Sequence, residues 1–386
     1  MKLPQKLQQK LHFRQENQAL RHLPSYGQEV DFSSNDYLGF AQNSSLFDAV
    51  HDLLIARNLK KNGATGSRLI SGNYPLYTET EACIAAFHQT ESALLFNSGY
   101  DANVGFFSAV PQRGDVILYD ENCHASIRDG LQLSLAKSFK FDHNDPGALQ
   151  RLLEKWNLAR QKENYFEIYV VLESVYSMDG DTPPLEAMVK LCERNQAYLV
   201  VDEAHALGVM GDYGEGVAQY LQLHSRIFAR IVTFGKGLGC HGAAVLGSRD
   251  LQSYLVNYAR SFIYTTGLSP HSVATIYMGY QFLQQEKKTV TALQSRIVHM
   301  NQEIKRLGLQ PIFVYSKSAI HCVIIPGNEN VRQLAQSLQA TGFEVKPILS
   351  PTIPEGQERI RFCLHANTPL EAITAVLEQL TSLLFR

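Results

Sequence analysis

Short runs of apolar residues recur along the middle of this chain, and stretches with helical periodicity separate them. The runs stand at 93–96, 116–119, 168–172, 198–201, 231–234 and 243–246. The intervening pattern predicts helices over 76–90, 124–135, 146–158 and 185–195. Because strands that are buried on both faces have almost no polar positions, this alternation predicts a mostly parallel α/β sheet covered by helices.

The two ends of the chain have a different pattern. A surface helix is expected over 3–20, and an amphipathic helix over 45–60. A long helical stretch over 270–308 is followed by strand-like 321–325, 344–348 and 359–364 and by helix-like 329–341 and 368–384. We therefore expect an N-terminal helix and segment (1–44), a large α/β domain (45–280) and a smaller C-terminal α+β domain (281–386).

Composition narrows the class of protein without naming an activity. The 386 residues are 45% hydrophobic and 19% charged, which is enough apolar material for a sizeable core. The net charge of −2 gives no basic footprint for nucleic acid. The six cysteines include no close pair, so no metal site is expected. The polar N-terminus and the absence of a run of eighteen apolar residues predict a cytoplasmic protein with no membrane segment.

Polar residues with chemical potential follow the apolar runs. In open α/β sheets, ligands bind beyond the carboxyl ends of the strands, so these positions should meet at one edge. They are Ser98, Gly99, Tyr100, His124, Glu173, Ser177, Asp202, His205, Thr233 and Lys236. Each alone has an ordinary reading, such as a loop histidine, a capping carboxylate or a turn lysine. Five strand ends that together deliver His, Glu, Asp, His and Lys favour a functional site.

Two motif-like stretches do not support nucleotide chemistry. Residues 202–205 spell Asp-Glu-Ala-His, a magnesium-binding box of helicases, but a helicase also needs a P-loop. Lys236 follows a glycine as in a P-loop, yet Gly237 stands where Ser or Thr is required. The glycine-rich loop 63–72 has the wrong spacing for a nicotinamide-binding fingerprint.

Pyridoxal phosphate accounts for this set of residue types. Its aldehyde needs a lysine amine, which Lys236 offers, and its pyridine nitrogen needs a carboxylate, which Asp202 offers. The phosphate needs hydroxyls and a helix N-terminus, and the ring benefits from a flat group stacked on one face. Ser98 with the Gly99 and Tyr100 amides, Thr233, His124 for the ring and His205 for the phenolic oxygen could meet these needs.

With these residues assembled, the chain resembles the α-oxoamine synthases, which are fold-type I pyridoxal-phosphate enzymes. The resemblance runs nearly end to end, through residues 31–39, 66–72, 173–181, 233–239, 264–266 and 359–362. It implies a fold-type I transferase with a mostly parallel sheet in a large domain and a smaller C-terminal α+β domain. Within the family, the similarity is greatest to the member that acts in biotin biosynthesis.

The resemblance also implies roles for individual residues. Lys236 would carry the cofactor and remove the α-proton, Asp202 would pair with the ring nitrogen, His124 would stack on the ring and His205 would bond the phenolate. The residues implied to hold the phosphate or line the pocket are Ser98, Gly99, Tyr100, Thr233, Glu173 and Ser177, with Thr265 and Thr266 reaching in from a second subunit of a homodimer. Asn35 and Arg361 would bind the amino-acid carboxylate, because a guanidinium matches a carboxylate bidentately. Arg21 would approach the acyl substrate, although a surface-helix arginine is the plainer reading.

The implied reaction joins L-alanine to pimeloyl-CoA or a pimeloyl-carrier protein, with release of CO₂ and CoA. Relatives that use glycine or serine share most cofactor residues and stay open as alternatives. The short segment between Arg21 and Asp31 leaves the acyl chain open. An ordinary aminotransferase, or a non-enzymatic regulator built on an aminotransferase-like domain, are the rival classes.

Overall fold

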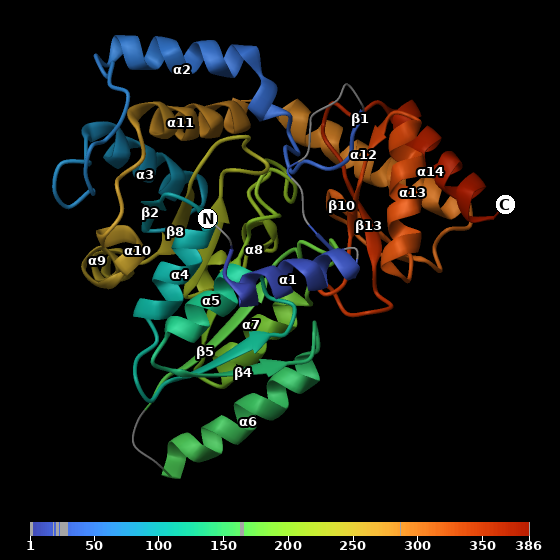
Figure 1. Cartoon of the computed structure of the whole chain (residues 1–386). Helices are drawn as coiled ribbons and strands as arrows, with labels where there is room; N and C mark the ends of the chain where they lie inside the picture. The colour runs from blue at the N-terminus through green and yellow to red at the C-terminus, as the bar shows by residue number, and fades with distance from the viewer. Residues whose placement is uncertain are drawn as a thin grey trace. The chain divides into compact units, whose positions relative to one another are not determined.

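The computed structural model describes residues 3–17, 19–20, 23, 30–162, 166–285 and 287–385. The chain forms two compact units, drawn in Figure 1. The smaller consists of Met1–Ser34, Met178–Gly180 and Gln294–Arg386, and the larger of Asn35–Ser177 and Asp181–Leu293. Each unit is described by itself below, and the expected division at 44/45 and 280/281 stays a prediction.

A seven-stranded sheet forms the centre of the larger unit. Its strand order is β2 (Ser92–Phe96), β8 (Ala243–Gly247), β7 (Ala229–Thr233), β6 (Tyr198–Asp202), β5 (Ile168–Glu173), β3 (Val116–Asp120) and β4 (Lys137–Phe141). Only β8 runs against its neighbours, while the pairs from β7 through β4 are parallel. The carboxyl ends of the other six strands therefore lie at one edge of the sheet, as the apolar runs predict.

The strands are apolar along their length because both faces of the sheet are covered. On β3, Ile117 points into one buried cluster, whereas its neighbours Val116 and Leu118 point into the other. The first cluster also contains residues of helices α4 (Gly99–Ala109), α5 (Ala125–Leu133), α9 (Arg249–Tyr258) and α10 (Arg260–Ile263). The second contains residues of α6 (Pro146–Lys162) and α7 (Leu185–Arg194). Each fully buried aliphatic side chain contributes about 1.5–3 kcal/mol.

Further helices complete the larger unit. Helix α2 (Ser44–Ala56) packs along α11 (Pro270–Gln285), which also contacts α3 (Pro75–Phe87), as Figure 1 shows. The short helical segments are η1 (Phe40–Gln42), α8 (Val217–Tyr220) and η2 (His224–Arg226). The helical stretch expected over 270–308 is two helices, α11 and α12 (Lys287–Arg306), and the boundary between the units falls within α12.

The smaller unit is α+β. Its antiparallel sheet has the order β12 (Lys346–Ile348), β13 (Arg359–Cys363), β10 (Ile320–Ile324) and β9 (Phe313–Val314). A parallel pair joins β1 (Val30–Asp31) to β11 (Phe343–Glu344), and the helices are α1 (Gln5–Glu16), α13 (Asn328–Ala340) and α14 (Leu370–Leu384). The single strand expected over 344–348 is wrong, because the buried Val345 separates β11 from β12 and these strands belong to different sheets.

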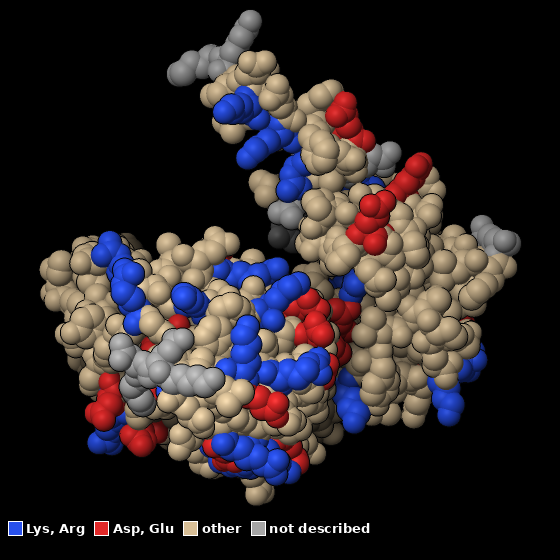
Figure 2. Space-filling view, turned by 90° about the horizontal axis from the view of Figure 1, so that it is seen from below, with Lys and Arg blue, Asp and Glu red and all other residues tan. Residues whose placement is uncertain are grey.

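The surface carries both signs of charge. On the face in Figure 2, Lys and Arg side chains stand among Asp and Glu, in line with the net charge of −2. Across the described ranges, none of the helices combines the length and apolar character needed to cross a membrane. The same residues contain no cluster of three or more His, Cys, Asp or Glu side chains suited to a metal ion.

Candidate active site

The carboxyl ends of three adjacent strands bring the predicted residues together in the larger unit. Glu173 at the end of β5 lies opposite Asp202 at the end of β6 in the parallel register. Asp202 in turn lies beside Ile231 of β7, and Lys236 is the third residue after the end of that strand. Both carboxyl groups are buried. Since this placement follows from strand direction and order, the topology itself assembles the site.

Lys236 lies at the end of a chain of hydrogen bonds between side chains. Its Nζ lies 2.8 Å from Nε2 of His205, and Nδ1 of His205 lies 2.7 Å from the hydroxyl of Tyr37. The Tyr37 hydroxyl donates to Oδ1 of Asn35 at 3.1 Å. Because that hydroxyl has one proton, it accepts from Nδ1–H of His205, which leaves Nε2 as the acceptor that faces Lys236. Asn35, Tyr37 and His205 thus orient the amine of Lys236.

A second line of hydrogen bonds connects Asp202 to His124. Nδ2 of Asn103 donates to Oδ2 of Asp202 at 2.8 Å and to Oγ of Ser126 at 3.0 Å. The Ser126 hydroxyl lies 2.8 Å from Nδ1 of His124. Asn103 is 2% exposed and Ser126 1% exposed, so water competes little for these contacts. An amide turned the other way would place its oxygen against the carboxylate, so the orientation of Asn103 is fixed.

Burial sets the protonation of two groups here. It raises the pKa of Glu173 to about 8, and the neighbouring charge of Asp202 adds to the increase. Glu173 therefore holds a proton at neutral pH, and its Oε1 accepts the backbone N–H of His124 at 2.5 Å. Burial lowers the pKa of His124, so its imidazole is neutral at neutral pH. The arrangement places the protonated carboxyl group of Glu173 beside that of Asp202.

The N-terminus of α4 lies next to the end of β7. Ser98 is the N-cap of α4, and its hydroxyl accepts from the N–H of Asp101 at 3.0 Å. A Cβ at Gly99 would lie 3.4 Å from the Thr233 side chain, so the two segments are in direct contact. Because N–H groups of a first helical turn lack partners within the helix, those of Gly99 and Tyr100 can bind an anion.

The remaining predicted site residues lie in several different segments of the chain. Nδ2 of Asn97 donates to Oγ1 of Thr265 at 3.1 Å and to the carbonyl of Thr266 at 2.8 Å within the same chain. Ser177 is half-buried in the turn after β5. Arg361 belongs to β13 of the smaller unit, where it pairs with Cys322 of β10, and its role at the site stays a prediction. Arg21 lies outside the described residues.

Sequence reasoning missed Asn103 and Ser126 and gave Tyr37 no role. Asn103 lies inside α4, where a polar residue in a helix is usually solvent-exposed. One signal was available, because Asn103 stands between the buried positions Ala102 and Phe106, and a buried amide needs a partner. Tyr37 falls within the 31–39 motif, and its partner His205 is 168 positions away.

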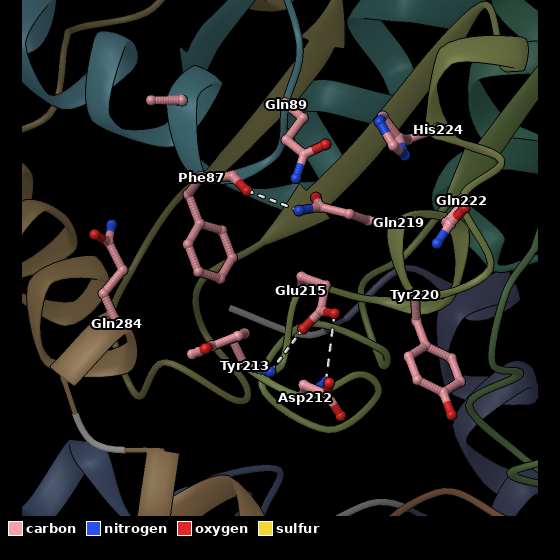
Figure 3. A pocket seen from close by; sticks show the side chains of 11 residues that line it. Phe87, Gln89, Asp212, Tyr213, Glu215, Gln219, Tyr220, Gln222, His224 and Gln284 are labelled. Atoms are coloured by element: carbon pink, nitrogen blue, oxygen red, sulfur yellow. Dashed lines mark hydrogen bonds between the residues drawn. The ribbon is translucent and has the colours of Figure 1, made fainter.

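The larger unit also contains a groove of about 980 Å³ that belongs to a different surface. Figure 3 shows Phe87, Tyr213 and Tyr220 around it, with Glu215 accepting from the backbone of Asp212 and Tyr213. None of the candidate active-site residues is among the described residues that line it. The volume of a groove therefore does not locate the chemistry in this chain.

The chain is similar to known proteins in both sequence and fold. The family model for aminotransferase class I and II matches residues 28–380. An 8-amino-7-oxononanoate synthase from Emericella nidulans is 40% identical over 94% of this chain and 91% of its own length.

Two solved structures are similar in fold. A serine palmitoyltransferase variant from S. paucimobilis with bound PLP–myriocin aldimine has a TM-score of 0.87 and 25% identity, covering 98% of this chain and 96% of that one. An 8-amino-7-oxononanoate synthase from Francisella tularensis has a TM-score of 0.76 and 25% identity, covering 92% and 98%. The expected fold, that of the fold-type I pyridoxal-phosphate transferases, is confirmed.

Proposed function

We propose, from the premise that this chain belongs to the aminotransferase class I and II family, that it condenses L-alanine with a pimeloyl thioester. The products are 8-amino-7-oxononanoate, CO₂ and CoA or free carrier protein, in biotin biosynthesis. The chain is a pyridoxal-phosphate-dependent acyltransferase, which its relatives support along most of its length. The observation that carries the choice of substrates is the 40% sequence identity between this chain and the Emericella enzyme.

The residues present fit pyridoxal phosphate. Asp202 is a buried carboxylate held by the Asn103 amide, which suits a partner for a protonated ring nitrogen. Lys236 presents its amine beside His205, which suits the attachment of an aldehyde. Ser98 and the first turn of α4 offer an anion site next to the Thr233 hydroxyl. Amine, carboxylate and phosphate-binding groups are thus all present in one unit.

When bound, the cofactor supplies an aldehyde for amines and a ring that withdraws electrons from the α-carbon of the amino acid. The chain's own residues then act as follows. Asp202, held by Asn103, keeps the ring nitrogen protonated. Lys236 takes the α-proton, and Nε2 of His205 accepts a hydrogen bond from its Nζ. Asn35 and Arg361 bind the carboxylate of L-alanine, and Arg21 approaches the acyl chain.

Serine or glycine as the amino acid is the second candidate. The fold similarity to serine palmitoyltransferase favours it, since the cofactor residues alone do not set the amino acid.

The experiment is to incubate the purified protein with L-alanine, glycine or L-serine, each with pimeloyl-CoA or palmitoyl-CoA. Free CoA thiol and CO₂ are then measured.

The outcomes separate the candidates. Release of CoA and CO₂ with L-alanine and pimeloyl-CoA alone supports the proposal. Release with serine and palmitoyl-CoA, or with glycine, replaces the substrates and keeps the reaction class. Conversion of the amino acid to a keto acid without thiol release would show an ordinary aminotransferase and refute the acyl transfer.

We propose further that the chain acts as a cytoplasmic homodimer with shared sites. The resemblance assigns Thr265 and Thr266 to the neighbouring subunit's phosphate, and in this chain Asn97 holds both residues. Sedimentation of the purified protein tests the dimer. A mixture of Lys236→Ala and Thr265→Ala/Thr266→Ala chains tests sharing, because mixed dimers would regain one intact site.

A further inference from the structure

His143 lies between two carboxylates outside the residues discussed so far. Its Nδ1 is 2.8 Å from Oδ1 of Asp120, and its Nε2 is 2.8 Å from Oδ2 of Asp181. An ionised carboxylate can only accept, so both ring nitrogens carry protons and the side chain is an imidazolium. The carboxyl group of Asp120 is 1% exposed and that of Asp181 is 21% exposed, so solvent screens this cluster only in part.

The three residues join three segments that lead into the candidate site. Asp120 is the last residue of β3, four positions before His124. Asp181 follows Ser177 by four positions, in the turn after β5. His143 follows β4, the edge strand. His143 thus connects the segment that carries His124 to the turn that carries Ser177, and Asn144 makes a second connection between the same two carboxylates.

Both carboxylates also accept hydrogen bonds from Asn144, the residue after His143. Asp120 accepts from the backbone N–H groups of Asn122 and Asn144, both at 2.9 Å. Asp181 accepts from Nδ2 of Asn144 at 2.6 Å, and its carbonyl accepts from the N–H of Tyr176 at 3.1 Å. The carboxylate of Asp120 is thus bonded to the backbone that leads to His124, and the backbone carbonyl of Asp181 is bonded to Tyr176, which precedes Ser177.

The surroundings keep the charge on His143. Burial alone lowers its pKa, but the hydrogen bonds and charges of Asp120 and Asp181 outweigh burial and raise the pKa to about 10. The ring of Tyr176 stands edge-on to the imidazole at 4.5 Å, and its hydroxyl accepts from the N–H of Glu173 at 3.4 Å. The imidazole is faced by Asp120 from β3, by Asp181 and Tyr176 from the turn after β5, and by Asn144 from its own loop.

We propose that His143 is a positioning residue of the active site: as a cation bridging Asp120 and Asp181, it holds the His124 segment against the Ser177 turn. The proposal rests on the proposed function for its effect on catalysis. Its effect on the position of His124 is independent of that function. Without the cation, two carboxylates would face each other across a site that burial partly shields from water.

The test uses the full chain with His143→Gln, which removes the charge, and His143→Arg, which keeps a cation that can reach two carboxylates. Lys140→Gln is the matched control, since Lys140 lies three residues away and pairs with Glu121 on the exposed surface. Circular dichroism establishes that each variant folds. Nitrogen NMR of labelled histidine reports His143 and His124 in the cofactor-free protein, and cofactor titration and steady-state kinetics follow.

At pH 8 we expect both ring nitrogens of His143 to be protonated. The His124 resonances should move in His143→Gln, and the kcat/KM for the amino acid should fall about 10- to 100-fold. His143→Arg should recover part of that loss, and Lys140→Gln should match the wild type. A neutral His143 at pH 8, or unmoved His124 resonances in a folded His143→Gln, would overturn the proposal. If the wild type shows no acyl transfer, the proposed function fails while the NMR result still decides the role of His143. Should His143→Gln not fold, Asp181→Ala removes the acceptor for Nε2 of His143 and breaks the same bridge from the other side.

Discussion

Gly237→Ala should separate the two segments that place Lys236 against His205. A Cβ at Gly237 would lie 2.2 Å from the carbonyl oxygen of Leu207 and 3.3 Å from the Cα of Gly208. Carbon–oxygen contacts normally lie at about 3.3–3.6 Å, so the two backbones must part by roughly 1 Å. No flexible side chain can take up this movement, because the obstructing atoms belong to the main chain.

The size of the effect follows from that displacement. Overpacking of this kind costs about 1–3 kcal/mol, which corresponds to a fall in Tm of about 2–12 °C at 2–4 °C per kcal/mol. Leu207 is two residues after His205 and Gly237 directly follows Lys236, so the 2.8 Å contact between Nζ and Nε2 should lengthen. A displacement of about 1 Å at reacting groups lowers the rate about 100-fold.

Calorimetry and steady-state CoA release measure the two effects. Gly63→Ala is the matched control, since a Cβ there would have no atom within 4 Å and should change neither quantity. A Gly237→Ala protein with the wild-type Tm would refute the packing argument. A lowered Tm with an unchanged rate would instead refute the claim that this contact positions Lys236.

Four further outcomes are expected. Lys236→Ala should fold, as seen by circular dichroism, and lose the visible absorbance of lysine-bound cofactor; retained absorbance would contradict its role. Arg361→Ala should raise the KM for L-alanine far more than the dissociation constant of the cofactor, and unchanged saturation by L-alanine would count against it. Asn103→Ala removes a hydrogen bond to the carboxylate of Asp202, which is worth about 1.5–3 kcal/mol, so cofactor titration should show affinity weakened about 10- to 100-fold. Because the pKa of Glu173 is raised from 4.5 to about 8, the cofactor-free wild type should lose stability relative to Glu173→Gln as pH rises from 4.5 to 8, with no further change above it. Urea unfolding at several pH values measures this difference, and a constant difference across that range would contradict the raised pKa.

Strands buried on both faces were the most predictable part of the fold. Runs such as 168–172 contain no polar residue, and such a run is hard to place anywhere except inside a sheet covered on both faces. Strand β4 was not predicted, because Lys137 and Lys140 on this edge strand are exposed and interrupt the apolar pattern. Lysines on an edge strand discourage pairing with another chain. Because these lysines are polar, the strand lacks the apolar pattern by which the other strands are predicted.

The candidate-site residues that come just after a strand could be predicted from the sequence. Asp202 and Lys236 follow apolar runs directly, so the rule that ligands bind at carboxyl ends selects them without knowledge of contacts. Tyr37 and Asn103 follow no strand of the sheet. Their importance depends on which residues they contact, and no local pattern encodes a contact between positions 37 and 205 or between 103 and 202.

The residues that were missed have one physical role in common, which is to orient other side chains. Asn103 and Tyr37 hold other side chains in place, Asn103 by donating to Asp202 and Tyr37 by binding Nδ1 of His205. A group that reacts must be of a particular chemical type, and type can be read from a sequence. A group that orients another needs only a donor or acceptor at the right distance, which many residue types supply. Sequence reasoning therefore finds the reacting groups of such a site first, and the structure is needed for the residues that fix their protonation and direction.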